Sequence, residues 1–483
     1  MKKIALLFFL SLTTHYSFSQ ELISSTTVDL KKNRDIFQTV NNEKKTVTLF
    51  ISDKEKVKAI NLNGKMQIID SISSKRPDTK TYINMIGYNL KNNSTRLFWS
   101  SNDCQKILAE IYSFDNHETS IKEYSLNLKN EKVLQKFSED EKFYLLTVEK
   151  STNNLKLHQF DNDGNYTEHI ISLEGFHFYK KDYSKTNLSG ILEYSFLPFE
   201  GPYDLQNINV NNPTSLTDAA LKRKSYFSKN QLIITNDVNP AFTQLIIIDL
   251  QKFIAVEKII KSPIIPSVSS SGFAVSISSN SFLIDSKLYQ IKSSSDILYF
   301  TIKDLDGNLI KEYVADSNTP IDFKNSEIYQ EGGDFFGGKR TLESSSQFIR
   351  KINNLNSGLA CYHIGENTLI TFGGISAVRQ SGGQAVMNQF GLIGGIIGAV
   401  AFNPTMESFN SYSNRKVVKI EGLFDKNGNH IKGDLQPLAF DKIRTFFDDN
   451  TDVSSQTLFK MDSYYLGYYD NKTKEYIIRR FAD

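Results

Sequence analysis

The chain has 483 residues, of which 40% are hydrophobic, 12% aromatic and 23% charged, and this composition is that of a globular protein and excludes a disordered chain. Its 56 basic and 54 acidic residues nearly cancel, which argues against a nucleic-acid partner, because phosphate neutralisation needs a basic surplus. Two cysteines, Cys104 and Cys361, exclude a disulfide scaffold and a Cys-rich metal site, and whether they pair is left open. No His or Cys cluster has metal-ligand spacing, so we expect neither a metal nor another cofactor.

Residues 1–19 have the layout of a secretory signal peptide. A basic pair precedes the apolar run Ile4–Leu12, and the small residues Ser17 and Ser19 stand just before Gln20. The apolar run is shorter than the roughly 20 residues that cross a bilayer. We therefore expect cleavage between Ser19 and Gln20 and export of the mature chain, to a periplasm or to the extracellular space.

From residue 35 to the end, short runs of β-branched and aromatic residues alternate with polar ones and stop at Asn, Asp and Gly clusters, as in β-strands. Three of these clusters, DNDGN (161–165), DLDGN (304–308) and DKNGN (425–429), stand at equivalent places in a repeat. They differ from calcium loops, because glycine is the fourth residue rather than the sixth and no glutamate closes the loop. The pattern predicts tight hairpin turns.

The hairpins end units of four short strands, which predicts a repeat architecture. Seven such units fill the chain: 33–75, 80–127, 130–173, 222–262, 275–318, 350–435 and 440–483. In repeat length and strand order the sequence resembles the β-propeller superfamily over nearly the whole mature chain, although it matches no named repeat family. The resemblance implies an all-β, seven-bladed β-propeller with two long loop insertions. Six or eight blades, or two β domains, are the alternatives.

We expect residues 20–483 to form a single, monomeric domain with insertions at about 174–221 and 376–414. The last unit is predicted to end with its fourth strand at 476–481. Closure of the ring is then left to contact between blade faces or to a strand added by residues 21–30.

The first insertion is rich in aromatic residues, at about twice the average of the chain. Phe176, Phe178, Tyr179 and Tyr183 are candidate ligand-binding residues, because aromatic faces stack on sugars and other flat surfaces. The alternative is that these rings only fix a long loop to the protein.

The second insertion contains an uncharged segment, QFGLIGGIIGAVAF (389–402), whose glycines have GxxxG spacing. It is too short to cross a membrane but could contact a membrane surface or a partner; the alternative is a buried structural plug. The candidate residues of this segment are Phe390, Gly391, Gly394, Gly395, Gly398 and Phe402.

No nucleophile motif or metalloenzyme motif is present, although paired carboxylates of a glycosidase would come from separate blades and leave no local motif. The predicted loops between second and third strands carry Asp53, Asp103, Asp237 and Asp462, and the last three are candidate ligand-binding residues. His158 and His169 flank one hairpin and are expected to form a surface pair across two strands.

The sequence favours an exported binding or scaffolding module for an unknown protein or glycan over an enzyme. A carbohydrate-active hydrolase or lyase on the same fold is the first alternative. An envelope-associated or membrane-surface protein that uses 389–402 is the second. The binding hypothesis predicts a pocket at the axis of the ring, lined by both insertions.

Overall fold

The computed structural model describes residues 21–28, 35–139, 141–195, 200–228, 230–266, 275–331, 339–376, 406 and 416–483. These residues form seven sheets of four to six strands and one two-stranded hairpin, β14 (Phe178–Tyr179) with β15 (Lys185–Thr186). Alternation of buried and exposed residues along most strands explains why these sequences form sheets rather than helices.

The first three sheets hold four antiparallel strands each, in chain order. Sheet one is β2 (Asp35–Asn41), β3 (Thr46–Ser52), β4 (Lys56–Leu62) and β5 (Ile68–Lys75). Sheet two is β6 (Asn84–Lys91), β7 (Ser94–Ser100), β8 (Lys106–Ser113) and β9 (Glu118–Ser125). Sheet three is β10 (Glu131–Glu139), β11 (Lys142–Glu149), β12 (Asn154–Asp161) and β13 (Tyr166–Ser172).

The next two sheets continue this order, and one extra strand joins the fourth. Sheet four is β16 (Gln206–Ile208), which is parallel to its neighbour, β17 (Arg223–Ser228), β18 (Gln231–Asn236), β19 (Phe242–Asp249) and β20 (Ile254–Lys261). Sheet five is β21 (Ser278–Ile284), β22 (Lys287–Ser293), β23 (Ile297–Asp304) and β24 (Leu309–Asp316). Helices α2 (Leu188–Glu193) and α3 (Leu216–Ala219) belong to the first insertion.

Sheet six takes its outer strands from a segment that precedes its inner strand in the chain. Its inner part is β27 (Asn356–Ile364), β28 (Asn367–Ile375) and β29 (Val417–Phe424), with the short β30 (His430–Ile431) paired to β29. The outer strands are β25 (Ile328–Glu331) and β26 (Lys339–Leu342), and helix α4 (Ser345–Asn353) connects them to β27.

Sheet seven is completed by the N-terminal strand. Strand β1 (Glu21–Thr27) pairs antiparallel with β33 (Glu475–Phe481), which is followed in the sheet by β32 (Tyr464–Asp470) and β31 (Val453–Lys460). The prediction that residues 476–481 form the fourth strand of the last unit is therefore wrong, because they form the third and β1 is the fourth. The last predicted unit, 440–483, begins with helix α7 (Ala439–Asp449) and not with one of its four strands, because the apolar residues there repeat at intervals of three and four.

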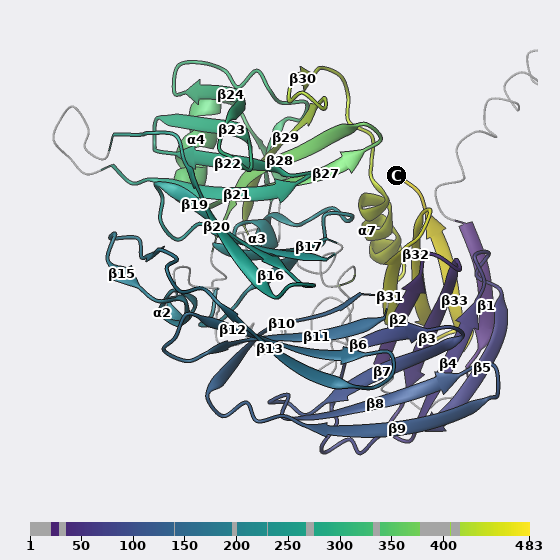
Figure 1. The fold of residues 1–483 in the computed structure, drawn as a ribbon. Coiled ribbons are helices and arrows are strands. Elements are labelled where there is room, and N and C mark those ends of the chain that lie inside the picture. The colour runs from purple at the N-terminus through teal and green to yellow at the C-terminus, as the bar shows by residue number, and fades with distance from the viewer. Residues whose placement is uncertain are drawn as a thin grey trace, which may run out of the picture.

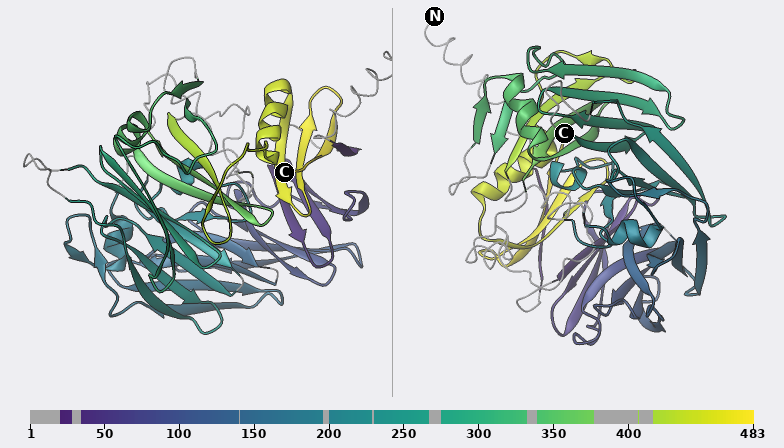
Figure 2. Two further views of the ribbon diagram at one scale, coloured as in Figure 1. Left: turned by 90° about the horizontal axis from the view of Figure 1, so that it is seen from above. Right: turned by 90° about the vertical axis from the view of Figure 1, so that its left-hand side faces the viewer.

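Neighbouring sheets contact one another in chain order around a ring, and sheet seven returns to sheet one (Figures 1 and 2). Shared apolar clusters join the pairs one–two, two–three, three–four, four–five, five–six and seven–one. The all-β, propeller-like fold predicted from the sequence is thus confirmed. The seven described sheets follow the seven predicted units, and the blade count of the whole chain stays a prediction.

The predicted hairpin turns also dock neighbouring sheets on one another. In the turn 161–165, the Asp161 carboxylate accepts hydrogen bonds from the backbone N–H groups of Asp163 and Asn165, at 2.9 and 2.7 Å. Gly164 has a φ of +84°, which only glycine adopts without strain, and its carbonyl accepts a 2.9 Å hydrogen bond from the Tyr124 hydroxyl of sheet two.

The turn 425–429 repeats this contact. Gly428 has a φ of +79°, and its carbonyl accepts a 2.8 Å hydrogen bond from the Tyr313 hydroxyl of sheet five. The tyrosine is preceded two residues earlier by a lysine in both outer strands, Lys122 and Lys311. Each turn thus joins its own sheet to the preceding one.

We predict that removal of β1 destabilises the whole ring. A chain that starts at residue 30 loses the β1–β33 ladder and Val28, which is buried between sheets one and seven. Its midpoint of thermal unfolding should lie at least about 5 °C below that of the chain 20–483, since a loss of a few kcal/mol shifts the midpoint by several degrees in a large domain. Equal midpoints, measured by circular dichroism, would show that closure does not depend on β1.

Candidate functional site

The aromatic candidates of the first insertion are distributed between the core and the surface. Phe178 is buried and Phe176 is half-buried in the apolar cluster between sheets three and four. Tyr179 meets the ring of Phe242 edge to face at a centroid distance of 6.2 Å. Tyr183 is exposed. None of these four residues lines the pocket described below, and their role in binding stays a prediction.

The aspartate candidates lie in three different sheets. Asp103 is exposed, and hydrogen bonds from Ser101 and from the turn backbone lower its pKa. Asp237 is buried and binds Lys224 at 3.0 Å. Asp462 accepts a hydrogen bond from Tyr465 and lies between the first and second strands of sheet seven, not between the second and third as predicted.

The candidates of the second insertion, Phe390, Gly391, Gly394, Gly395, Gly398 and Phe402, lie outside the described residues. Among the residues that the structure describes, no helix is long and apolar enough to cross a membrane. Cys104 and Cys361 are both buried and are not bonded to each other.

The predicted surface pair of histidines is wrong. His158 is buried, because its strand faces sheet two, and its Nε2 lies 3.0 Å from a Glu131 carboxylate oxygen while Nδ1 lies 2.8 Å from the Tyr166 hydroxyl. His169 stacks on Phe253 of sheet four instead. Glu131 also accepts hydrogen bonds from Thr147 and Lys156, so this network links all four strands of sheet three.

The interface between sheets six and seven differs from the other interfaces of the ring. Among the described residues, no apolar cluster contains side chains of both sheets. One face of sheet six packs on sheet five, whereas the other faces helix α7, which packs with its apolar side on sheet seven (Figures 1 and 2). The gap left between sheet six and α7 is where the structure has a pocket.

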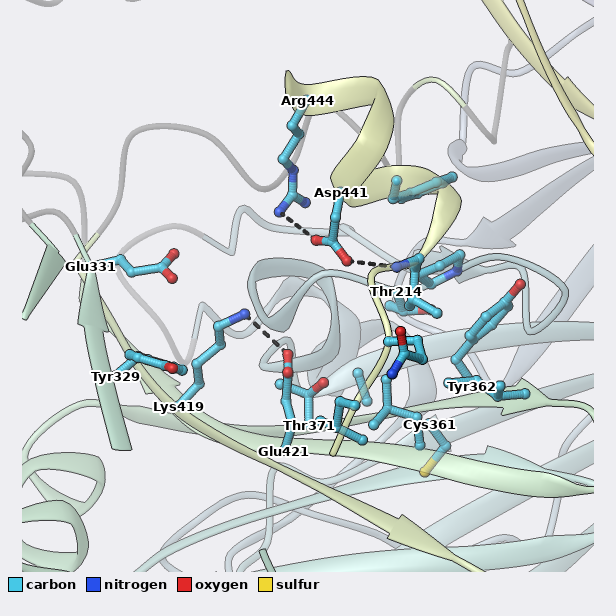
Figure 3. Close-up of a pocket in the computed structure, with 18 residues that line it drawn as sticks. Thr214, Tyr329, Glu331, Cys361, Tyr362, Thr371, Lys419, Glu421, Asp441 and Arg444 are labelled. Atoms are coloured by element: carbon cyan, nitrogen blue, oxygen red, sulfur yellow. Dashed lines mark hydrogen bonds and ion pairs between the residues drawn. The ribbon is translucent and has the colours of Figure 1, made fainter. Parts of the chain in front are cut away.

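The pocket has a volume of about 300 Å³ and combines one wall of strands with one wall of helix (Figure 3). This volume is at the lower end of the range of small-molecule sites. The strand wall presents residues of β25, β27, β28 and β29, and the opposite wall comes from α7 and the segment before it, with two residues of the first insertion between them. The lining side chains with polar groups are Thr214, Tyr329, Glu331, Cys361, Tyr362, Thr371, Lys419, Glu421, Gln436, Asp441 and Arg444.

Strand alternation explains why charges face this pocket. Along β29, Val418 and Ile420 are fully buried toward sheet five, so Lys419 and Glu421 point to the opposite side. The Lys419 ammonium lies 3.1 Å from a Glu421 carboxylate oxygen.

The helix wall carries a second pair of opposite charges. Arg444 lies one turn after Asp441, at 3.9 Å between guanidinium nitrogen and carboxylate oxygen (Figure 3). The other Asp441 oxygen accepts a 3.0 Å hydrogen bond from the backbone N–H of Leu438, which fixes the start of the helix. Donors and acceptors therefore face the pocket from both walls.

The predicted pocket at the axis of the ring, lined by both insertions, is tested only in part. The first insertion contributes Pro213 and Thr214, and the second insertion lies outside the described residues apart from Ser376 and Met406. None of the predicted site residues that the structure describes lines the pocket. The signal that could have revealed it is the pair Lys419 and Glu421, two charges on one face of a strand whose other face is apolar. Among the described residues, no cluster of His, Cys, Asp or Glu could hold a metal ion.

Comparisons with known proteins found solved structures of low similarity and no family. No family model matches the chain, and no curated protein is similar to it. The WD40 domain of SCAP from fission yeast is 11% identical and is similar over 95% of this chain and 98% of that chain, with a TM-score of 0.34. Hsv2 of Kluyveromyces lactis is 11% identical over 71% of this chain and 94% of that chain, with a TM-score of 0.25.

The cobalt-substituted apocarotenoid oxygenase of Synechocystis is 8% identical, with a TM-score of 0.28. The similarity covers 63% of this chain and 64% of the oxygenase, which is less than two thirds of that protein. Similarity this low gives no information about a ligand or a reaction of this protein.

A second group of charges lies between sheets one and two, away from the pocket. Burial raises the pKa of Asp35 to about 6, and the Arg76 guanidinium opposes this shift. Arg76 stacks on the ring of Trp99 at 3.8 Å from its centroid and donates to the Tyr82 carbonyl at 3.0 Å. The pKa of Asp35 is about 4 in the unfolded chain and about 6 in the folded protein. The protonated carboxyl group therefore contributes fully to stability below pH 4, and this contribution is lost as the pH rises through 6.

We predict that Asp35→Asn raises the free energy of unfolding above that of the parent more at pH 7 than at pH 4. The gain should be at most about 2–3 kcal/mol, which corresponds to a shift of two pKa units. The measurement is the difference in unfolding midpoint between variant and parent at pH 4, 5, 6 and 7. The exposed Asp434→Asn is the control and should show no such trend. A difference that does not grow with pH would contradict the raised pKa.

Proposed function

We propose that the protein is an exported binding module whose pocket between sheet six and helix α7 takes a small, hydroxyl-rich ligand of the glycan class. The observation that supports this most is that, among the described residues, no apolar cluster joins sheets six and seven, and polar side chains line a cavity there. Charged side chains are seldom placed between sheets unless paired or functional, and here they surround a cavity.

The lining chemistry favours a ligand that both donates and accepts hydrogen bonds. Carboxylates accept, the lysine and arginine donate, and the Tyr and Thr hydroxyls do both. A sugar ring offers the matching hydroxyl groups on its rim and a flat face for an aromatic ring such as that of Tyr329. Among the described lining residues, the carboxylates Glu331, Glu421 and Asp441 outnumber the cations Lys419 and Arg444 by one, which favours a cationic sugar over an anionic one.

Binding is favoured over hydrolysis because Glu421 and Asp441 already have structural roles. Glu421 is paired with Lys419, and Asp441 holds the first turn of α7. A general acid and a base need carboxyl groups that can exchange a proton with the substrate.

We predict that the chain 20–483 binds glucosamine more tightly than glucose, and both more tightly than glucuronate. Glu421→Gln should weaken glucosamine binding about tenfold, since it removes a charged acceptor. Glu366→Gln, an exposed residue of the turn between β27 and β28, is the matched control. Isothermal titration calorimetry measures the dissociation constants of the parent chain and of both variants.

Two results would contradict the proposal. One is the absence of binding to any sugar of the series, in calorimetry and in thermal shift. The other is an equal loss of affinity in Glu421→Gln and Glu366→Gln. If the protein released a sugar from an oligosaccharide, its function would be catalysis and the proposed binding role would be wrong.

Export rests on the sequence of the first residues, with β1 beginning directly after the proposed cleavage site. We predict that the full chain, expressed in a bacterium with a secretion pathway, yields a mature protein that starts at Gln20. Ser19→Arg should block cleavage, because the site needs a small residue, whereas Ser24→Arg should not. Intact mass spectrometry distinguishes the products, and an uncleaved parent chain would contradict export.

A further inference from the structure

The two walls of the pocket are joined by one side chain outside it. One carboxylate oxygen of Asp483, Oδ2, accepts a hydrogen bond from the hydroxyl of Tyr362, which belongs to the strand wall. The other, Oδ1, accepts a 2.9 Å hydrogen bond from the backbone N–H of Ala439, the first residue of α7. Asp483 is not among the residues that line the pocket.

Asp483 is itself held in place by the helix that it contacts. Lys442 of α7 donates a 2.6 Å hydrogen bond to the carbonyl of Ala482. Phe481 is fully buried in the apolar cluster that fixes α7 to sheet seven. A carboxylate at a helix N-terminus is also favoured by the helix dipole. The segment 481–483 therefore moves with α7 rather than with sheet six.

Tyr362 is the point of sheet six at which the polar contacts of sheet seven converge. The Lys460 ammonium donates to its hydroxyl at 3.1 Å, and the Tyr464 hydroxyl lies 3.4 Å from it. Lys460 also lies over both tyrosine rings, at 5.2 and 4.8 Å from their centroids, and it donates to the Asn211 carbonyl at 2.8 Å. Burial lowers the pKa of Lys460, and Asp483 opposes this shift.

We infer that Asp483 is a positioning residue, which through Tyr362 and Ala439 sets the separation of the two walls and thereby the affinity of the pocket. We call these three residues the wall clip. The inference rests on the proposed binding site for the ligand, but the clip itself exists without one. It takes the place of the apolar cluster that joins sheets at the other interfaces.

Linkage gives the clip a second consequence. A ligand that touches both walls is bound more tightly when the walls are held at the correct separation, and by reciprocity it strengthens the clip. Glucosamine should therefore slow hydrogen exchange of the Ala439 amide itself, although Ala439 is not a lining residue.

The first test needs no ligand. Asp483→Ala removes both acceptors and should increase hydrogen–deuterium exchange in peptides covering 438–443 about fivefold, since the backbone N–H of Ala439 loses its hydrogen-bond acceptor. Asp483→Asn keeps one acceptor for Ala439 and should restore most of the protection. Asp448→Ala, an exposed acid of the same helix, is the control and should leave exchange unchanged.

Tyr362→Phe tests the coupling, because it removes the hydroxyl and keeps the ring. Combined with Asp483→Ala, it should add little to the exchange caused by the single change, as expected for two partners of one interaction. Full additivity, or equal exchange in Asp483→Ala and the parent, would overturn the clip.

The second test uses glucosamine. Asp483→Ala should weaken its binding at least fivefold, and Asp483→Asn should restore it to within about twofold, since one wall contact is kept. If the parent binds glucosamine and Asp483→Ala binds it equally well, the positioning role is wrong. If exchange responds as expected but the parent binds no sugar, the clip stands and the proposed function fails.

Discussion

The antiparallel pairing of β1 with β33 is the interaction on which the rest of the structure depends. It places residues 21–27 and 475–481 in one sheet, so that the two ends of the described chain hold each other. The chain then continues into sheet one, which shares an apolar cluster with sheet seven around Val47 and Tyr476. Sheet seven is thus fixed to sheet one both by a hydrogen-bonded ladder and by burial (Figure 1).

The stable contact between sheets seven and one explains why the interface between sheets seven and six can be polar. Because sheet seven is already fixed to sheet one, its interface with sheet six need not supply an apolar cluster. Helix α7 and part of the first insertion occupy the space instead, and strand β29 can present Lys419 and Glu421 to a cavity. The first insertion is anchored separately, since the fully buried Arg223 binds Glu200 at 2.9 Å and donates to backbone carbonyls of α2. The site is therefore built where ring stability is supplied from elsewhere.

The sequence predicted what is encoded locally. The alternation in VVKIEGLF and the turn around Gly428 follow from residues within a few positions, and strands and hairpins were found in the right order. A strand from residues 21–30 was one of the two closures left open, and its pairing with β33 confirms it, but nothing local in the sequence decided between them. Helix α7 was missed although Phe440, Ile443 and Phe447 have helical spacing, because the repeat suggested a strand. The pocket was missed because its walls come from segments that are adjacent only after folding.

The docking of a turn on the preceding sheet has a consequence for how such a chain can change. The contact needs only a glycine carbonyl in one unit, as at Gly164 and Gly428, and a tyrosine two residues after a lysine in the unit before, as at Tyr124 and Tyr313. Sheets two and five thus carry the same tyrosine donor, and sheets three and six carry the same glycine carbonyl acceptor. If a gene segment that encodes whole sheets were duplicated or exchanged at these boundaries, the contacts between turn and preceding sheet would be kept. The ring can therefore evolve by gain or exchange of complete four-stranded units.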